Sequence, residues 1–457
     1  MRGVQKRVVV IGGGPAGHEA ASYSARYGAG VALVEKDILG GSAHLRDCVP
    51  SKTMIATGGA LNFVRRVQGM GLEDVDPHVD RAGLRARILA IEARLSDAVG
   101  ILLRSQGVQI VQGAGRLVDP HLVEVEGPDG PVELPADVIV LATGSRPRVA
   151  DWAPVDGDRV LTTRDAYPPA EIPEHLIVIG SGVTGVEFVH MFSSLGSRVT
   201  LVVSRQQVLP GKDPEAAAVL EQSFLERGVH LLKGARATRI ERDDDSVRVF
   251  CDDGRVAVGS HALLAIGSIP NSDDLGLSEA GVKLDEGGYV EVDHNLKSSV
   301  PHIYAAGDLS GRLPLSSVAA MQGRKIAEHA MGLHADRPHR HLDYDKAASA
   351  IFAEPEIADV GLAEADAFAT GRKIRVTKVP FSSNAKALIN DDPRGFVKIV
   401  SDPATGVVLG GSIVGRHAAE LISVIALAVA CGLRVQDVDE ALFVYPTLSE
   451  ALAEAAE

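Results

Sequence analysis

Three glycines near the start of the chain have the spacing that suits binding of a diphosphate. Gly12, Gly14 and Gly17 follow a β-branched run at 7–11, and an alanine-rich segment at 18–27 predicts a helix after them. In such a turn the first glycine permits the tight bend, and the second lets the backbone approach a diphosphate. The third lets the helix pack on the sheet, so the spacing predicts half of a dinucleotide-binding fold.

An acidic residue and a second glycine turn strengthen this prediction. Glu35 ends the next expected strand, 31–35, where a carboxylate can bind ribose hydroxyls. The same unit occurs again, with a strand at 175–179, the turn GSGVTG at 180–185 and, after a helix, a strand at 198–203. A GxGxxG sequence alone can be only a turn, but the strands around both copies favour two dinucleotide folds.

The second unit ends differently from the first. The strand at 198–203 continues into Ser204 and Arg205, without the acid that would bind a free ribose 2′-hydroxyl. An arginine there can pair with a 2′-phosphate, which favours NADPH over NADH. The alternative is that Arg205 is a solvated surface charge.

Two more expected strands end in glycine. The strand at 138–143 leads to Gly144, and the strand at 303–306 leads to Gly307 and Asp308. An acid in this place can accept hydrogen bonds from a polyol such as the ribitol of a flavin. Its alternative role is to cap the next helix.

Length and composition restrict the class of protein. The 457 residues, 46% of them apolar, suit about three globular domains. Lys and Arg number 46 against 60 Asp and Glu, and the net charge of −14 without a basic run argues against a nucleic-acid partner. Cys48, Cys251 and Cys431 are too few for a disulfide framework, which favours a reducing compartment. The longest apolar stretch, 422–433, is too short to span a bilayer, so we expect a cytoplasmic protein with no membrane span.

The last third of the chain predicts a separate domain. A polar, His-rich segment at 334–345 predicts a linker, and because its histidines lack the spacing of metal ligands we expect no metal site. From Ala347 onward, strands at 395–400 and 407–415 and an apolar helix at 418–431 predict an α+β domain. The expected fold is therefore α/β, with two Rossmann-like domains and a C-terminal α+β domain.

Taken in order, these motifs resemble the pyridine nucleotide-disulfide oxidoreductase family, which includes lipoamide dehydrogenase, glutathione reductase and mercuric reductase. The resemblance covers almost the whole chain and depends on GGGPAG, GGSAHLRDCVPSK at 40–52, LATGSRP, GSGVTGVE, AIGSIPN at 265–271, IYAAGD, LSSVAAMQGR at 315–324 and IFAEPEIADVG at 351–361. It implies an FAD-binding domain at 1–150 and 271–345, an NAD(P)-binding domain at 151–270 and a dimerisation domain at 346–457. A homodimer is expected, with a higher homo-oligomer left open.

The resemblance also implies which residues bind FAD and NAD(P)H. The expected cofactor-binding residues are Gly12, Gly14, Pro15, Ala16, Gly17, Glu35, Lys36, Gly41, Ser42, Cys48, Lys52, Gly115, Ala142, Thr143, Gly144, Gly180, Gly182, Val183, Thr184, Gly185, Glu187, Ser204, Arg205, Gly267, Gly307, Asp308, Leu315, Ser316 and Ser317. Lys52 matches the family lysine beside flavin N5, and Glu187 matches the acid that pairs with it near the nicotinamide. A cation there stabilises the charge of reduced flavin. The alternative is an exposed lysine and a glutamate on a helix surface.

The chain departs from the family at the residues that reduce disulfides. The family's redox loop has two cysteines five positions apart, whereas this chain has Ala43 and Cys48. The attacking thiol is missing, so reduction of lipoamide or glutathione disulfide is not expected. Tyr445 replaces the general-acid histidine of the C-terminal motif, with Glu450 retained, and a phenol is a poor base at neutral pH. Ser268 replaces an arginine of the nicotinamide turn.

Cys48 keeps three interpretations. Pro50 is expected at the first helical position, which would place Cys48 near a helix N-terminus, where a thiolate is favoured. If the helix continues to Lys52, the two side chains share a face. The thiol would then contact the flavin, cycle as a sulfenic acid, or fill space as a small hydrophobe.

A chain that keeps flavin reduction without a dithiol can pass two electrons directly to a small acceptor. Quinones are flat, need no enzyme thiol, and take a proton that Tyr445 or solvent can donate. The redox loop and YPTLSE most resemble an actinobacterial lipoamide-dehydrogenase-like branch that reduces quinones. We therefore expect an FAD-dependent NAD(P)H:quinone oxidoreductase with Lys52, Glu187, Cys48, Tyr445 and Glu450 at its catalytic site. The alternatives are a single-cysteine peroxidase or oxidase that uses Cys48, a soluble transhydrogenase, and a non-enzymatic flavoprotein redox sensor.

Overall fold

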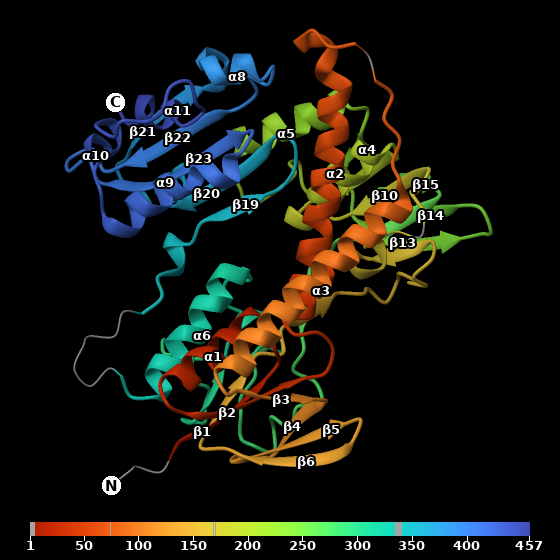
Figure 1. The fold of residues 1–457 in the computed structure, drawn as a ribbon. Helices are drawn as coiled ribbons and strands as arrows, with labels where there is room; N and C mark the ends of the chain where they lie inside the picture. The colour runs from red at the N-terminus through yellow and green to blue at the C-terminus, as the bar shows by residue number, and fades with distance from the viewer. Residues whose placement is uncertain (1–4, 74, 168, 170, 334–340) are drawn as a thin grey trace. The chain divides into compact units, whose positions relative to one another are not determined.

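The computed structural model describes residues 5–73, 75–167, 169, 171–333 and 341–457 (Figure 1). The chain divides into two compact units: the first comprises Met1–Pro50, Arg81–Arg148 and Gly267–Tyr344, and the second comprises Ser51–Asp80, Val149–Ile266 and Asp345–Glu457. Within the predicted linker, residues 334–340 lie outside the described part of the chain. The three expected domain boundaries stay a prediction.

A five-stranded parallel sheet forms the centre of the first unit. Its elements are β1 Arg7–Ile11, β2 Gly30–Glu35, β3 Gln109–Gln112, β7 Val138–Leu141 and β18 Ile303–Ala305, with helices α1 Pro15–Arg26, α3 Arg81–Ser105 and α6 Ser316–Ala330. The strand order is β18-β7-β1-β2-β3, with parallel pairing throughout. Both faces are buried: Val8 and Val10 enter one hydrophobic core, and Val9 and Ile11 enter the other. This explains why β1 reads as a continuous β-branched run.

Shorter strands complete the first unit. They are β4 Ala114–Asp119, β5 Leu122–Gly127 and β6 Gly130–Pro135 in an antiparallel sheet, and the pair β8 Ser145–Pro147 and β17 Ser268–Pro270. Leu117, Val123 and Val125 of the antiparallel sheet share a core with β1. On the other face, α1 and α6 approach so closely that a Cβ atom at Gly323 would lie 2.2 Å from the carbonyl oxygen of Ala16.

The second unit contains a second parallel sheet. Its elements are β9 Val160–Thr162, β10 His175–Ile179, β11 Arg198–Val203, β12 His230–Lys233 and β16 His261–Leu264, helices α4 Val183–Leu195 and α5 Pro214–Glu226, and an antiparallel sheet of β13 Ala237–Arg242, β14 Val247–Cys251 and β15 Val256–Gly259. The order β12-β11-β10-β16-β9 repeats the arrangement of the first sheet, with the glycine-turn strand in the middle. The sequence prediction of two Rossmann-like folds is confirmed.

The remainder of the second unit is an antiparallel sheet covered by a helix. Its elements are β19 Ser349–Ile351, β20 Glu356–Gly361, β21 Arg375–Pro380, β22 Phe396–Ser401 and β23 Val408–Gly415, with helices α7 Glu364–Thr370, α8 Ala385–Ile389, α9 Ala418–Cys431, α10 Val435–Asp439 and α11 Glu450–Glu454. The strand order is β19-β20-β23-β22-β21, and Leu421, Ile422 and Ile425 of α9 pack into its core. This is the predicted C-terminal α+β domain.

The redox-loop segment corrects one prediction. A π-helical turn, Ala43–Cys48, runs directly into α2, Val49–Arg66, so Pro50 is not the first helical residue and Cys48 is not at a helix N-terminus. The turn is closed by the Val49 N–H, which donates to the carbonyl oxygen of His44, five residues earlier. A proline in the first turn of a helix looks the same in the sequence as one that follows a wider turn, which is why the start was misplaced.

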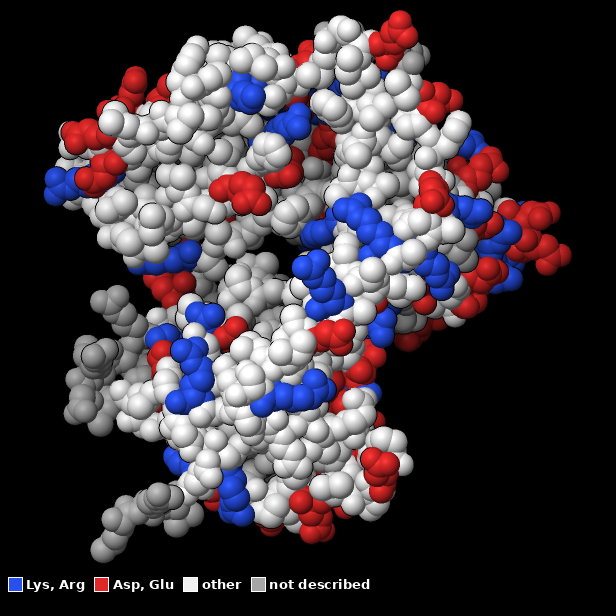
Figure 2. All heavy atoms as spheres, viewed as in Figure 1, with Lys and Arg blue, Asp and Glu red and all other residues white. Residues whose placement is uncertain are grey.

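Smaller differences concern where elements end. α1 begins at Pro15 rather than at 18, and β7 ends at Leu141, before the expected 143. Short 3₁₀ segments occur at Val67–Met70, Thr163–Ala166, Gly307–Ser310, Tyr344–Lys346 and Phe381–Ser383. No helix in the described ranges is long and apolar enough to cross a membrane. Acidic and basic side chains are interspersed over the described residues on the face shown in Figure 2.

Candidate functional site

The first glycine turn lies between β1 and α1, and its glycines serve different purposes. Gly12 has φ +102°, and a Cβ atom there would lie 2.3 Å from the carbonyl oxygen of Ala142. A Cβ at Gly17 would lie 1.8 Å from the carbonyl oxygen of Gly12. Gly14 has φ −65°, which any residue adopts, and a Cβ there would meet only the Cα of Gly41 at 3.8 Å. Protein packing does not require glycine at position 14, whereas close approach of a diphosphate does.

The N-terminus of α1 is suited to an anion. Its N-cap residue, Gly14, has no side chain, its first turn contains no acidic residue, and Pro15 is its first residue. By contrast, the side chain of Asp213 caps α5 by accepting a hydrogen bond from the N–H of Glu215. The amide groups and the dipole at the start of α1 therefore fit the diphosphate of FAD.

Two histidines beside this turn carry buried polar atoms. Nδ1 of His18, in α1, and Nδ1 of His44, in the redox loop, are buried and have no hydrogen-bond partner among the described residues. Burial lowers the pKa of both imidazoles, so both are neutral at neutral pH. A neutral imidazole can donate to or accept from a bound polar group, which suits a cofactor in this place.

Glu35 is buried at the end of β2, where the ribose of FAD is expected. Its Oε2 accepts a hydrogen bond from the N–H of Gly13 at 2.7 Å, and its Oε1 accepts one from the N–H of Asp37 at 2.7 Å. Each oxygen of an ionised carboxylate has a second lone pair. The side chain is thus held in place and can still accept hydrogen bonds from ribose hydroxyls.

The turns after β7 and β18 are joined by side chains of the first unit. Ser145 Oγ donates to Oδ2 of Asp308 at 2.6 Å. Thr143 Oγ1 donates to the carbonyl oxygen of Asn271 at 2.7 Å, and Asn271 Nδ2 donates to the carbonyl oxygen of Thr143 at 2.9 Å. The alternative role of Asp308 as a helix cap is not observed: Asp308 is the second residue of the 3₁₀ segment Gly307–Ser310, and the N-cap residue of that segment, Ala306, makes no side-chain cap. Ser145 belongs to the motif LATGSRP, but nothing in the sequence predicts its hydrogen bond to Asp308.

The second glycine turn, between β10 and α4, repeats the geometry of the first. A Cβ at Gly180, whose φ is +111°, would lie 2.2 Å from the carbonyl oxygen of Ala265, and one at Gly185 would lie 1.8 Å from that of Gly180. A Cβ at Gly182 would meet nothing within 4 Å, and its φ of −73° does not require glycine. The N-cap residue of α4, Gly182, also has no side chain, and the first turn of the helix has no acidic residue. The turn therefore fits the diphosphate of NAD(P)H.

Lys52 in α2 and Glu187 in α4 form an ion pair in the second unit. Lys52 Nζ lies 2.7 Å from Glu187 Oε2, and the glutamate side chain is only 8% exposed. Its Oε1 accepts a hydrogen bond from the N–H of Phe352 at 3.0 Å, and the ring of Phe352 lies 5.0 Å from Lys52 Nζ. The structure thus brings together two residues that the resemblance paired. It adds Phe352, which belongs to the motif IFAEPEIADVG but whose contact with Glu187 was not predicted from the sequence.

The remaining cofactor candidates occupy the same two turns and their surroundings. In the first unit, Ala16 is buried in α1, Lys36 is exposed, Ser42 Oγ donates to Asp37, and Gly115 lies in β4. Gly144, Gly267 and Gly307 have positive φ, Leu315 is the N-cap residue of α6, and Ser316 and Ser317 begin that helix. In the second unit, Val183 and Thr184 begin α4, and Ser204 and Arg205 are exposed after β11. Arg205 forms no salt bridge with another described residue.

The structure does not join Tyr445 to Glu450. Tyr445 is 73% exposed, and Oε2 of Glu450 accepts a hydrogen bond from the N–H of Thr447 at 3.0 Å. Within the described residues, no hydrogen bond links the phenol with this carboxylate. Within one protomer, the two side chains therefore form no preformed acid–base couple, and the phenol is exposed.

None of the three cysteines forms a disulfide within the described part of the chain. Cys48 is half-buried, Cys431 is exposed and Cys251 is buried, and burial raises the pKa of the Cys251 thiol. Ala43, at the position of the family's attacking thiol, is exposed. The redox loop is therefore present as a turn, with one thiol.

Comparison with known families decides the classification. A model described as pyridine nucleotide-disulphide oxidoreductase matches residues 6–323. The chain belongs to this family. The family's dimerisation domain matches residues 347–456, so the C-terminal domain is a dimerisation domain and the protein forms a homodimer. Pyridine nucleotide-disulphide oxidoreductases use FAD and NAD(P)H, so this member is a flavoprotein oxidoreductase with both cofactors.

Individual relatives match along nearly the full length of the chain. NAD(P)H dehydrogenase (quinone) of Mycobacterium tuberculosis is 43% identical over 98% of this chain and 93% of its own. Dihydrolipoyl dehydrogenase 2 of Haloarcula marismortui is 34% identical over 98% and 95%. The crystal structure of LpdA from Mycobacterium tuberculosis aligns with a TM-score of 0.93 and 42% identity over 99% of both chains.

Arg205→Ala is expected to raise the KM for NADPH about 10-fold and to change that for NADH less than about 2-fold. The reason is that an exposed guanidinium, directly after β11 and without a salt bridge to another described residue, can pair with a 2′-phosphate that only NADPH carries. Steady-state kinetics with both nucleotides measures the effect. Arg198→Ala, at the other end of β11 and paired with Glu174, is the matched control. Equal changes in KM for NADPH and NADH would mean that Arg205 is a solvated surface charge that does not bind the 2′-phosphate.

Proposed function

We propose that this flavoprotein is an NAD(P)H:quinone oxidoreductase. The observation that supports this most directly is that Lys52 and Glu187 remain paired while Ala43 replaces the attacking thiol. The name of the Mycobacterium tuberculosis relative at 43% identity agrees with a quinone acceptor. Cysteines that form no disulfide among the described residues also suit a protein of the cytoplasm.

The roles follow from the two glycine turns. When bound, FAD would take a hydride from NAD(P)H and deliver two electrons to the quinone. The turn at Gly12–Gly17, with Glu35 and Asp308, would hold FAD, and the turn at Gly180–Gly185 would hold the nicotinamide nucleotide.

The remaining roles belong to side chains that carry charge or protons. We assign Lys52 to stabilising the negative charge of the reduced flavin, with Glu187 holding the ammonium group in one orientation. Tyr445 or water would donate the proton that the quinone oxygen needs. The phenol of Tyr445 is exposed, so both the phenol and water are accessible as proton donors.

A disulfide substrate does not fit this site. Reduction of a disulfide requires a thiolate that attacks one sulfur and a second thiol that resolves the mixed disulfide. Cys48 is the only cysteine of the redox loop, and Cys251 and Cys431 lie in β14 and α9 of the second unit. The chain can therefore form no dithiol in that loop.

Anaerobic stopped-flow spectroscopy tests the proposal directly. The holoenzyme is reduced with one equivalent of NADPH and then mixed with a benzoquinone, with oxidised lipoamide as the negative control. We expect fast reoxidation by the quinone and none by lipoamide. Flavin that is reduced but is not reoxidised by any quinone would refute the proposal, and reoxidation by NAD⁺ instead would indicate a transhydrogenase.

Cys48→Ala is expected to keep at least about half of the quinone reductase activity, because direct electron transfer needs no enzyme thiol. The thiol is half-buried and is not at a helix N-terminus, so helix geometry gives it no special activation. Steady-state turnover with NADPH and a benzoquinone measures the result. Complete loss of activity, together with trapping of wild-type Cys48 by dimedone, would favour the sulfenic acid mechanism.

A further inference from the structure

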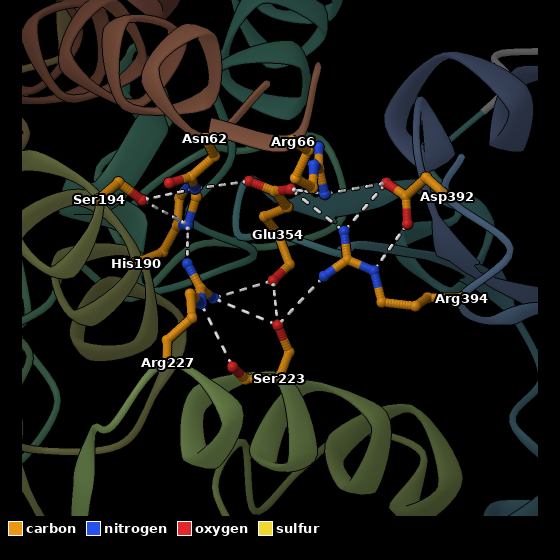
Figure 3. Close-up of polar contacts among 9 residues, drawn as sticks. All are labelled: Asn62, Arg66, His190, Ser194, Ser223, Arg227, Glu354, Asp392 and Arg394. Atoms are coloured by element: carbon orange, nitrogen blue, oxygen red, sulfur yellow. Dashed lines mark hydrogen bonds and ion pairs between the residues drawn. The ribbon is translucent and has the colours of Figure 1, made fainter. Parts of the chain in front are cut away.

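A second polar cluster in the second unit lies beyond the residues of the proposed mechanism. We call it the Glu354 cluster, and Figure 3 shows its members converging on the Glu354 carboxylate and carbonyl group. It consists of Asn62, Arg66, His190, Ser194, Ser223, Arg227, Glu354, Asp392 and Arg394. These residues come from α2, from α4, from α5 and its C-cap residue Arg227, and from the C-terminal domain, so the cluster connects segments that are far apart in sequence.

The carboxylate of Glu354 is paired on both oxygens. Oε2 accepts a hydrogen bond from Asn62 Nδ2 at 2.7 Å, and Oε1 lies 2.7 Å from Arg66 Nη1 and 3.1 Å from Arg394 Nη2. Burial raises the pKa of Glu354, but the Asn62 hydrogen bond and the arginine charges outweigh burial and lower it to about 2. The side chain is therefore an anion at every pH at which the enzyme is expected to work.

The backbone of Glu354 is held equally firmly. Its carbonyl oxygen accepts hydrogen bonds from Ser223 Oγ and from Arg227 Nη2, each at 2.9 Å. Arg227 Nη1 donates in turn to Nδ1 of His190 at 2.9 Å. Burial lowers the pKa of His190 to about 3, so its ring is neutral and Nδ1 can accept. Together, these contacts connect α4 and α5 to the backbone carbonyl group of Glu354.

The same elements carry the Lys52–Glu187 pair. Lys52 lies on α2 with Asn62, Glu187 lies on α4 with His190, and Phe352, which donates to Glu187, is two residues before Glu354. The two helices also touch directly at Gly58 and Ser194, because a Cβ at Gly58 would lie 2.8 Å from the Cβ of Ser194. Asn62 Nδ2 also donates to Ser194 Oγ, at 2.9 Å. Helices packed this closely move as rigid bodies, so contacts at one end affect the other.

We propose that Glu354 is a positioning residue, which acts through Phe352 and α2 to hold Lys52 and Glu187 in contact during flavin reduction. The inference depends on the proposed role of the Lys52–Glu187 pair. Losing the Glu354 charge leaves Arg66 and Arg394 without this partner and releases α2 from the segment that contains Phe352. The ion pair would then sample longer separations, and a loosely placed charge stabilises a transition state poorly.

The test compares Glu354→Gln and Asn62→Ala with Glu356→Gln in the FAD-loaded dimer. Glu356 is a matched control, because it is two residues away, is similarly half-buried and accepts a hydrogen bond from the N–H of Ala419, in α9, at 3.0 Å. The first measurement is the rate of flavin reduction at saturating NADPH, with the dissociation constant for NADPH from the same traces. The second is hydrogen exchange of the peptide that contains the Phe352 amide, which does not depend on activity.

We expect Glu354→Gln and Asn62→Ala to slow flavin reduction about 5-fold with little change in NADPH affinity, and to speed exchange at Phe352 about 10-fold. Glu356→Gln should change neither quantity by more than about 2-fold. In a Lys52→Met background, Glu354→Gln should have no further effect on the rate, because both changes remove the same interaction.

Three results would overturn the inference. They are unchanged exchange at Phe352 in both variants, an equal response from Glu356→Gln, and rate effects that multiply in the double variant. The proposed function fails separately, if Lys52→Met itself reduces flavin at the wild-type rate. Asn62→Ala keeps the buried charge paired with its arginines, so it remains informative if Glu354→Gln does not fold.

Discussion

Lys52→Met is expected to slow flavin reduction by NADPH about 100-fold, the size of effect seen when one preorganised charge or donor is removed from an active site. The ammonium group lies 2.7 Å from Glu187, whose other oxygen is held by the Phe352 N–H, so its position is defined from two sides. Methionine has a similar length and keeps contact with the Phe352 ring but carries no charge. Anaerobic stopped-flow measurement of flavin bleaching gives the rate.

Lys212→Met is the matched control for this prediction. Lys212 also forms a half-buried pair in the second unit, with Nζ 2.7 Å from Asp359 Oδ2, and its ammonium group donates to Ser349 Oγ at 2.9 Å rather than to Glu187. We expect its flavin reduction rate to stay within about 2-fold of wild type. A Lys52→Met rate within about 3-fold of wild type, or an equal loss in the Lys212 variant, would contradict a role for Lys52 in flavin reduction.

The fold could be predicted from the sequence because its signals are local. The runs at β1 and β10 are β-branched and buried on both faces, and each ends in glycines that backbone contacts require. A Cβ at Gly17 or Gly185 would overlap a carbonyl oxygen of its own turn, so these residues are fixed by contacts five positions away. Local rules of this kind do not depend on the rest of the chain.

The features that were not predicted depend on contacts between residues far apart in the sequence, or on small differences in the geometry of a helical turn. Ser145 meets Asp308 across 163 residues, and Asn62 meets Glu354 across 292, and no spacing rule links such positions. The pairing of Lys52 with Glu187 came from the family resemblance rather than from the residues alone. The start of the helix at Ala43 was missed because π-helical and α-helical turns have no separate sequence pattern.

This π-helical turn leads to the second prediction: Ala43→Cys is expected to form a disulfide with Cys48 in the oxidised protein. A turn closed from Val49 to His44, five residues apart, places residues separated by five on one side of the helix. Ala43 and Cys48 are separated by five, and a disulfide needs Cα atoms about 4.4 to 6.8 Å apart. Titration of thiols under denaturing conditions should then detect only Cys251 and Cys431 before reduction, and all the cysteines after it.

A regained disulfide should not by itself regain the family's chemistry. Tyr445 lacks the basicity of a histidine, and it has no hydrogen bond to Glu450 among the described residues, so the leaving thiol has no preformed acid. We expect Ala43→Cys to reduce lipoamide weakly and Ala43→Cys with Tyr445→His to do so at least about 10-fold faster. Ala43→Cys with Cys48→Ala is the control, since it can form no disulfide in the loop. If all the thiols of Ala43→Cys stay reactive after oxidation, the turn does not hold residues 43 and 48 close enough for a disulfide. The loop would then differ from the family's redox loop in its backbone geometry as well as in the missing thiol.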